Sequence, residues 1–562
     1  MTERQKPGAS SHGYERVADA LVEAGVECIF GVLGDDTGPL IHATSQRGIR
    51  YIFARHENQA VSMADGYSRA TGRTGVATVT TGPGLSNAIT AIHSAHRGNS
   101  RICVLVGAGN VEENDLDPDV VRSIGPASWL KFFPQTAVLK QIGVCSVKPT
   151  SAGTAWRETR KAMDLAASRT VVLVLPRNAL DDAVVEEAKD YMPENHQSSA
   201  PDAGQVSSLA DLLQESWAIN RPVILAGRGA VNANAGASLA RLGELTGALL
   251  ATSLPANGMF YGNPFNIGIC GTYATSLASE FITQADCVLA FGAGLNALTT
   301  YKNSLFPKAM VVQVDLDPNA FGKFVDIEMG IHGDCKDVAD MLIAELEKRS
   351  HKAEGFRTAQ VRDAIAGFSA SAGIKDKSTE QLIDPRTLMI ELDRILPGNR
   401  ILCADGGQQS RFSIRYIHVE KARNFMQASE AGSIGLGMGL AIGTAVARPG
   451  ELVVASIGDA SMMMALGDLE TAVRLKLPIL VLVVNDEALG SEVNFLLEQG
   501  LPTEVALTQS PSFAAIAQSM GAHAATVRNI QDLKVIEPWL KNPDVPLVLD
   551  CRINPDIRAH FL

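Results

Sequence analysis

Two aspartates that follow apolar runs give the most specific chemical signal in the sequence. Asp459 comes just after the run 453–457, and Asp486 just after the run 479–484, 27 residues beyond Asp459. A helix-length segment separates the two runs, and in such a unit the ends of parallel strands meet at one edge of the sheet. Carboxylate and other oxygen ligands suit a hard divalent cation. The spacing therefore predicts a Mg²⁺ site at this edge.

The residues around Asp459 also suit a phosphate. Gly458 precedes it, and Ala460 and Ser461 open a helix whose first backbone N–H groups have no partner within the helix. Gly-Asp alone is more often an ordinary helix cap. The second acidic segment at the predicted distance favours the interpretation as a metal-bridged phosphate site.

The elements that must position these residues repeat along the whole chain. Short runs rich in Val, Ile and Leu alternate with helix-length segments, which predicts parallel sheets with helices on both faces. Two stretches, 186–205 and 348–384, are charged and rich in small residues, which is typical of linkers. We therefore predict an α/β protein with three doubly wound parallel-sheet domains, at 12–183, 206–346 and 385–555.

The composition excludes several classes of protein. The chain has 562 residues, 46% of them hydrophobic, and a formal net charge of −12 at pH 7. This is a globular composition, and its acidic balance argues against binding nucleic acid. Its apolar runs are far shorter than the ~20 residues of a membrane span, and its eight cysteines are scattered singly. We expect a cytoplasmic protein with reduced thiols and no membrane partner.

At the predicted metal site the chain resembles thiamine diphosphate (ThDP) enzymes of the acetolactate synthase, pyruvate oxidase and benzaldehyde lyase superfamily. Residues 458–461 match the Gly-Asp-Ala form of the cofactor motif, while Asn485-Asp486 replaces the usual Asn-Asn. The resemblance implies that Asp459, Asp486 and the main-chain carbonyl of Ala488 bind the metal. Asp486 adds a negative charge beside the diphosphate, so the metal preference is expected to change.

The first predicted domain resembles the family independently. It carries three motifs in the family's order: Arg55-His56-Glu57, then Ala64-Asp65-Gly66-Tyr67-Ser68-Arg69, then Thr81-Gly82-Pro83-Gly84 with Asn87. The resemblance implies a pyrimidine-binding domain in which Thr81, Pro83 and Asn87 contact the cofactor. The resemblance also implies that Glu57 activates the cofactor, since a carboxyl group hydrogen-bonded to the aminopyrimidine favours the tautomer that deprotonates the thiazolium. We expect an apolar pocket to raise the pKa of Glu57.

The last predicted domain holds two further matches, and the resemblance makes it the diphosphate-binding domain. The family places a Gly-Gln-His near the diphosphate, and here Gly407, Gln408 and Gln409 stand there, with Gln in place of His. The stretch 432–437 is similar to the family's G-x-M-G-x-G. In the family, the large apolar residue of this stretch holds the cofactor in a bent conformation. Ile434, two residues after Gly432, takes that position here.

The central domain of acetolactate synthases often carries FAD. The arginine-rich stretch that accompanies FAD corresponds here to 292–300, which contains no Arg. FAD is therefore doubtful, and we expect a purely structural central domain.

Specificity in this family depends on residues over the reacting carbonyl. The Phe-Gln-Glu segment of acetolactate synthases corresponds to Leu130-Lys131-Phe132, which argues against a standard enzyme of branched-chain amino-acid synthesis. Lys131 could attract an anionic substrate, although solvent exposure explains it as well. For His93 and His96 we favour packing or solvent exposure over catalysis. Pocket residues are expected at Lys131, Phe132, Leu489, Ser491 and Glu492.

The resemblance implies an enzyme that makes or breaks a carbon–carbon bond next to a carbonyl. We expect decarboxylation of a pyruvate-like 2-oxo acid with carboligation to an acceptor carbonyl. Alternatives are a lyase or hydrolase acting on an acyloin or cyclic diketone, a 2-hydroxyacyl-CoA lyase, and a non-catalytic scaffold or regulator. The family also implies a dimer or tetramer with active sites at subunit interfaces.

Overall fold

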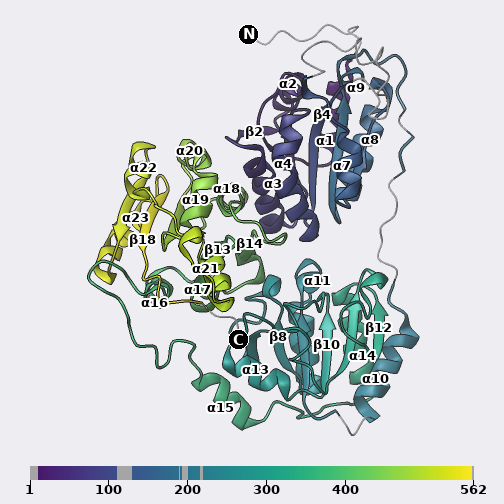
Figure 1. Ribbon diagram of the computed structural model, residues 1–562. Coiled ribbons are helices and arrows are strands. Elements are labelled where there is room, and N and C mark those ends of the chain that lie inside the picture. The colour runs from purple at the N-terminus through teal and green to yellow at the C-terminus, as the bar shows by residue number, and fades with distance from the viewer. Residues whose placement is uncertain (1–10, 110–129, 189, 193–199, 216–218, 560–562) are drawn as a thin grey trace.

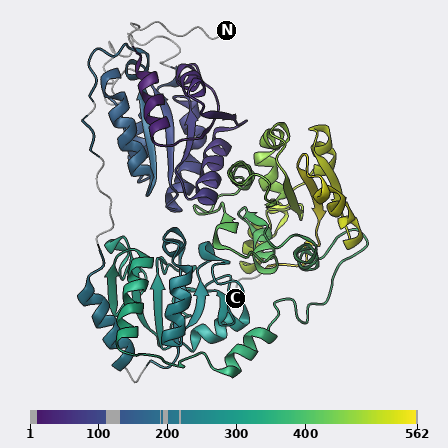
Figure 2. The same ribbon diagram turned by 180° about the vertical axis from the view of Figure 1, so that it is seen from behind.

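The computed structural model describes residues 11–109, 130–188, 190–192, 200–215 and 219–559. They form three six-stranded sheets in which all the strand pairs described are parallel (Figure 1). Each sheet has separate apolar clusters on its two faces. The predicted class, three doubly wound parallel sheets, is confirmed. Seen from both sides, the three units surround a common junction (Figures 1 and 2).

The first unit has the strand order β2-β1-β3-β4-β6-β5. Its strands are β1 (Cys28–Gly31), β2 (Arg50–Phe53), β3 (Gly75–Val79), β4 (Ile102–Ala108), β5 (Cys145–Val147) and β6 (Thr170–Pro176). Its helices are α1 (Gly13–Glu23), α2 (Gly38–Gln46), α3 (Glu57–Thr71), α4 (Pro83–Arg97), α7 (Gln135–Gln141), η1 (Ala152–Thr154), α8 (Ala155–Ala166) and α9 (Arg177–Asp181). Alternate residues of β4 enter the two apolar clusters, so both faces of the strand are buried.

The second unit has the order β12-β11-β10-β7-β8-β9. Its strands are β7 (Pro222–Ala226), β8 (Leu249–Thr252), β9 (Asn266–Ile269), β10 (Cys287–Phe291), β11 (Met310–Asp315) and β12 (Met329–His332). Its helices are α10 (Ala203–Glu215), α11 (Arg228–Asn232), α12 (Gly236–Thr246), η2 (Leu254–Ala256), α13 (Ser276–Thr283), η3 (Pro318–Ala320) and α14 (Cys335–Lys348). The expected linker at 348–384 is not wholly irregular, because it contains α15 (Ala359–Gly367).

The third unit has the order β14-β13-β15-β16-β18-β17. Its strands are β13 (Ile401–Ala404), β14 (Phe425–Gln427), β15 (Val453–Gly458), β16 (Ile479–Asn485), β17 (His523–Val527) and β18 (Leu547–Arg552). Its helices are α16 (Pro385–Ile395), α17 (Gln408–Tyr416), η4 (Ala422–Asn424), α18 (Gly437–Ala447), α19 (Asp459–Ala465), α20 (Gly467–Arg474), α21 (Gly490–Glu498), η5 (Glu504–Ala506), α22 (Phe513–Ser519), η6 (Ile530–Val535) and α23 (Ile536–Lys541).

The first and third units share one topology. Numbered from its own first strand, each has the order 2-1-3-4-6-5, whereas the second unit has the order 3-2-1-4-5-6 when read from β9. The similarity is not visible as a sequence repeat, because buried strands need only apolar residues and not the same ones.

Helices α3 and α18 join the first and third units. One apolar cluster runs through both units and includes Met63 of α3 and Leu440 of α18. Glycines let the backbones approach: a Cβ at Gly66 would lie 2.1 Å from the Leu440 carbonyl oxygen, and one at Gly443 would lie 1.8 Å from that of Met63. The side chains of Gln59 and Ser62 add hydrogen bonds to the backbone around α18.

We predict that Gly66→Ala destabilises the contact between α3 and α18. The added methyl meets backbone rather than a movable side chain, so the helices must separate, at a cost of about 1–3 kcal/mol. Urea unfolding measures the loss. Gly38→Ala, also in the first unit, is the matched control, because no atom lies within 4 Å of its added Cβ. Equal stabilities of the two variants would contradict the prediction.

The cysteines and the helices bear on the expected reduced thiols and on the expectation of no membrane partner. All eight cysteines carry free thiols, and seven of them are buried. Across the described ranges, the helices are all too short or too polar to span a membrane.

Candidate active site

Asp459 and Asp486 lie at the carboxyl ends of neighbouring strands. Strands β15 and β16 pair in register up to Gly458 and Val484, so the residues that follow them meet at one edge of the sheet. Burial raises the pKa of Asp459, although the Ser510 hydroxyl donates to its Oδ2 at 2.5 Å. Burial and the charge of Asp459 raise the pKa of Asp486 to about 7. The two carboxylates therefore repel each other, which a divalent cation would relieve.

Side chains of α17 and α21 support Asp486. The Gln408 amide donates to Asp486 Oδ2 at 3.4 Å, and Asn494 donates to Gln408 Oε1 at 2.5 Å. Glu487 adopts a left-handed φ of +53°, so the turn after Asp486 is strained for a residue other than glycine. Ala488 follows this turn and pairs with Leu507 in an isolated bridge. In the parts of the chain described, no cluster of three or more His, Cys, Asp or Glu suits a metal.

Asp405 ties the predicted diphosphate-binding segments together. Its fully buried carboxylate accepts backbone N–H bonds from Gly406 at 2.7 Å, Gly437 at 3.0 Å and Gly435 at 3.1 Å. It also accepts the Ser461 hydroxyl, and burial raises its pKa. One carboxylate thus orients the loop after β13, the glycine-rich loop before α18 and the start of α19. Sequence reasoning assigned Asp405 no role.

The other residues predicted here lie around this network. Gly407 is the N-cap residue of α17 and has a φ of +101°, and the Gln409 amide donates to the Gly406 carbonyl. A Cβ at Gly406 would lie 3.1 Å from a methyl of Ile434, so Ile434 packs beside that loop. Gly432 has a φ of +77° and no atom within 4 Å of an added Cβ. The next side chain, Ser433, has a buried Oγ without a partner among the described residues, which leaves a free group for a ligand.

Glu57 begins α3 in the first unit. Its half-buried carboxylate accepts a hydrogen bond from the Asn87 amide of α4, at 3.1 Å to Oε2. The preceding Arg55 is fixed to the third unit, because its N–H donates to Asp468 at 2.9 Å and its guanidinium pairs with Glu470 at 2.8 Å. The structure therefore brings Glu57 and Asn87 together.

Two buried side chains that the sequence analysis missed hold the loop at Thr81 and Pro83. Asp36 accepts the Thr81 N–H at 2.8 Å, and Gln135 accepts the Gly82 N–H at 2.9 Å. Gln135 also donates to the Gly107 carbonyl at 3.0 Å. A signal for Asp36 exists, since Gly34-Asp35-Asp36 follows an apolar run just as Gly458-Asp459 does.

The predicted substrate-pocket residues lie in two places. The backbone of Lys131 packs against the loop of Gly82, since a Cβ at Gly82 would lie 2.2 Å from the Lys131 carbonyl oxygen. Its ammonium group pairs with Asp35 and lowers the pKa of that carboxyl, so its charge is already partly balanced. Phe132 beside it is half-buried. The other three residues lie just before α21 or in its first turn, shortly after Asp486 in the chain: Leu489, Ser491 and Glu492.

Within one chain, α3 of the first unit binds the glycine-rich loop and the start of α18 in the third unit. Gln59, two residues beyond Glu57, donates to the Gly435 carbonyl at 2.5 Å and accepts the Gly439 N–H at 2.8 Å. Ser62 donates to the Leu436 carbonyl at 2.7 Å. The start of α3, which carries Glu57, is therefore held close to the glycine-rich loop that contains Ile434.

The fold and these residues define a class of protein, and three family models match the three units in order. They are the N-terminal TPP binding domain (residues 11–127), the central domain (206–342) and the C-terminal TPP binding domain (405–551) of thiamine pyrophosphate enzymes. The chain belongs to this family and is a thiamine diphosphate-dependent enzyme.

Within the family, the chain is similar to acetolactate synthase large subunits. It is 28% identical over 560 residues to the probable large subunit of Methanocaldococcus jannaschii, which covers 97% of this chain and 92% of the relative. It is 28% identical to the isozyme 3 large subunit of Escherichia coli, with coverage of 91% and 88%. The large subunit of Porphyra purpurea is 26% identical, with coverage of 99% and 94%.

Proposed function

We propose that the enzyme uses Mg²⁺ and thiamine diphosphate to decarboxylate pyruvate or a similar 2-oxo acid and to join the remaining carbon unit to an acceptor carbonyl. The observation that carries the proposal is the pair Asp459 and Asp486 at adjacent strand ends, where their repulsion calls for a cation. Similarity to acetolactate synthases over nearly the whole chain favours ligation over cleavage of an acyloin or diketone. We place the enzyme in the cytoplasm, where its thiols stay reduced.

The residues present fit the metal and the cofactor. Asp459 and Asp486, with the carbonyl of Ala488, would hold Mg²⁺, while the unpartnered Ser433 hydroxyl and the loops at Gly407 and Gly432 would face the diphosphate. The diphosphate and water would complete the coordination, because Mg²⁺ commonly retains water and binds phosphate together with one or two carboxylates.

The roles of the chain's own residues follow from their surroundings. When bound, thiamine diphosphate supplies a carbon nucleophile and an electron sink. Glu57 would hold a proton against the aminopyrimidine ring, oriented by the amide of Asn87. Ile434 would support the cofactor from the glycine-rich loop that Asp405 anchors. Thr81 and Pro83 would contact it from the loop that Asp36 and Gln135 hold.

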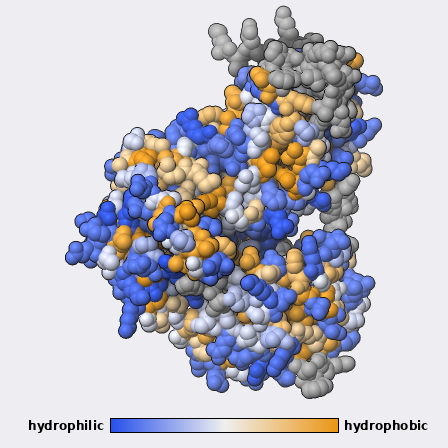
Figure 3. Space-filling model, viewed as in Figure 1, coloured by the Kyte–Doolittle hydropathy of each residue, from blue (hydrophilic) through white to orange (hydrophobic). Residues whose placement is uncertain are grey.

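We further propose a dimer or tetramer in which a second copy completes each site. Apolar side chains beside the metal site are exposed in the single chain: Met463 by 48%, Met464 by 62% and Phe495 by 57%. Figure 3 shows apolar residues gathered on this side of the third unit, in the region of α21. Exposed apolar surface of this kind favours coverage by another protein surface. Analytical ultracentrifugation tests this, and a fully active monomer would contradict it.

The reaction is tested with a panel of substrates. Pyruvate, other 2-oxo acids, acyloins and cyclic diketones are offered with several acceptor aldehydes, and the products are identified by mass spectrometry. We expect pyruvate to be consumed, with release of CO₂ and a ligated product, only when ThDP and Mg²⁺ are both present. Cleavage of an acyloin or diketone without use of any 2-oxo acid would contradict the proposal.

Asn substitutions separate the two metal carboxylates. We predict that Asp459→Asn weakens Mg²⁺ binding by at least ~100-fold, because a buried anionic ligand is lost. Asp486→Asn restores the family's usual residue and relieves the repulsion, so its affinity is expected to stay within ~10-fold of wild type. Mg²⁺ titration of thermal stability in the presence of ThDP measures both. Equal effects of the two substitutions would contradict the assignment.

A further inference from the structure

A cavity with several charged residues in its lining lies at the junction of the three units, and on its wall Gln427 and Glu430 belong to the segment between the end of β14 and the glycine-rich loop. It has a volume of about 60 Å³ and is lined by residues of all three units. A buried water needs ~15 Å³ measured in this way, so the cavity has room for several waters or for one small oxyanion. Its most prominent feature is four arginines: Arg69, Arg101, Arg228 and Arg423.

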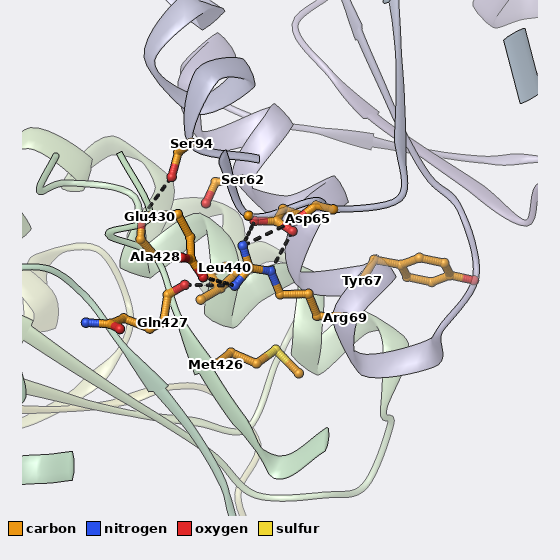
Figure 4. A network of polar contacts seen from close by, with 12 residues as sticks. Ser62, Asp65, Tyr67, Arg69, Ser94, Met426, Gln427, Ala428, Glu430 and Leu440 are labelled. Atoms are coloured by element: carbon orange, nitrogen blue, oxygen red, sulfur yellow. Dashed lines mark hydrogen bonds and ion pairs between the residues drawn. The ribbon is translucent and has the colours of Figure 1, made fainter. Parts of the chain in front are cut away.

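Two of these arginines have carboxylate partners. Arg69, in the last turn of α3, binds Asp65 through two hydrogen bonds of 2.7 and 2.8 Å and pairs with Glu430 at 3.3 Å (Figure 4). It also donates to the Gln427 carbonyl at 2.9 Å. Arg228 of the second unit pairs with the same Glu430. Asp65 and Glu430 thus balance the charges of Arg69 and Arg228, and neither carboxylate is left to balance another arginine.

The other two arginines have backbone partners. Arg101 donates to the Gly72 carbonyl at 3.1 Å. Arg423 donates to the carbonyls of Arg69 and Val231, at 3.3 and 3.5 Å, and both bonds are long. Among the residues that the structure describes, neither side chain forms an ion pair with a carboxylate.

The surroundings of Arg423 disfavour its charge. Burial and the charges of Arg101 and Arg448 lower the pKa of Arg423. The Arg423 guanidinium also lies against backbone, since a Cβ at Gly72 would be 3.2 Å from its Nη1 and Nη2. Like charges held together in partly buried positions are unfavourable unless an anion compensates them. Guanidinium groups match the oxygens of phosphate in geometry as well as in charge.

We propose that this cavity is an anion site that binds phosphate, or the phosphoryl group of a small metabolite, through Arg101 and Arg423. The cavity volume admits one tetrahedral group, and Asn99 and Asn232 on its wall offer further amide donors. Because the lining comes from all three units, only the assembled chain can bind the anion in this way. Bound anion therefore stabilises the arrangement of the units, including α3, which carries Arg69 in its last turn and Glu57 at its start.

The test uses protein saturated with ThDP and Mg²⁺, so that the cofactor's own phosphate site is filled. Isothermal titration calorimetry with inorganic phosphate at constant ionic strength is expected to show one binding site. Thermal unfolding is expected to shift upward by about 1–2 °C at tenfold excess over the Kd. Glycerol phosphate distinguishes the two sources: binding of both probes identifies a phosphoryl-group site, and binding of phosphate alone identifies a site for the free ion.

Variants locate the anion. Arg101→Gln and Arg423→Gln are each expected to weaken phosphate binding at least tenfold, while Arg423→Lys retains part of it. Arg241→Gln is the matched control, because Arg241 is a surface arginine paired with Glu244 and Glu347, and it should bind as wild type does. The absence of phosphate binding to the wild-type enzyme would overturn the proposal without any variant. Binding that survives both Gln substitutions would overturn it as well.

Discussion

Glu57→Gln is expected to lower kcat by about 10²- to 10⁴-fold, the range that one positioned acid–base group contributes. Glutamine keeps the size of the side chain and can still accept the hydrogen bond from Asn87, so the start of α3 is expected to stay folded. It cannot take up or release a proton near neutral pH. Steady-state turnover of pyruvate at saturating ThDP and Mg²⁺ measures the effect.

A control separates this effect from a general loss of charge at a helix start. Glu158 also lies in the first turn of a helix, α8, and pairs with Arg157. Glu158→Gln is expected to keep wild-type kcat, and Glu57→Gln to keep its affinity for ThDP within ~10-fold. Wild-type turnover in the Glu57 variant would show that another group performs the proton transfer.

Asp405→Ala is expected to destabilise the third unit by about 3–6 kcal/mol, because three buried N–H groups and the Ser461 hydroxyl lose their acceptor at once. The loops at Gly406 and Gly435 would then lose their common anchor, and ThDP binding is expected to fall at least 100-fold. Urea unfolding and calorimetric titration with ThDP measure the two effects.

Asp405→Asn sharpens this prediction. The amide retains one acceptor oxygen but turns an NH₂ group toward N–H donors, so we expect a loss of stability smaller than that of alanine. The order wild type, Asn, Ala in unfolding midpoint is the expected result. An alanine variant with the wild-type midpoint would show that the backbone alone holds the two loops.

The fold was largely predictable because buried parallel strands need continuous apolar runs. The runs at 75–80, 101–106, 171–175, 223–226, 311–315, 453–457 and 479–484 fall on strands β3, β4, β6, β7, β11, β15 and β16. The edge strands β5 and β14 have three residues each, and each pairs with one neighbour only. Such short strands produce no apolar run long enough to detect.

The candidate site was predictable where it follows strand ends, as at Asp459 and Asp486. It was not predictable where a side chain acts through distant backbone. Asp405 is 32 residues from Gly437, and Gln135 is 53 from Gly82, so only the folded chain reveals these anchors. Lys131 illustrates the same limit, because its pairing with Asp35 depends on two loops 96 residues apart.

Exchange of the C2 proton of bound ThDP for deuterium, followed by NMR without any substrate, tests the proposed role of Glu57 most directly. It reports activation of the cofactor whichever 2-oxo acid the enzyme uses. We expect the wild-type enzyme to exchange this proton at least ~100-fold faster than the enzyme with Glu57→Gln at equal ThDP occupancy. Equal exchange rates in the two proteins would contradict the role of Glu57 and the mechanism built on it.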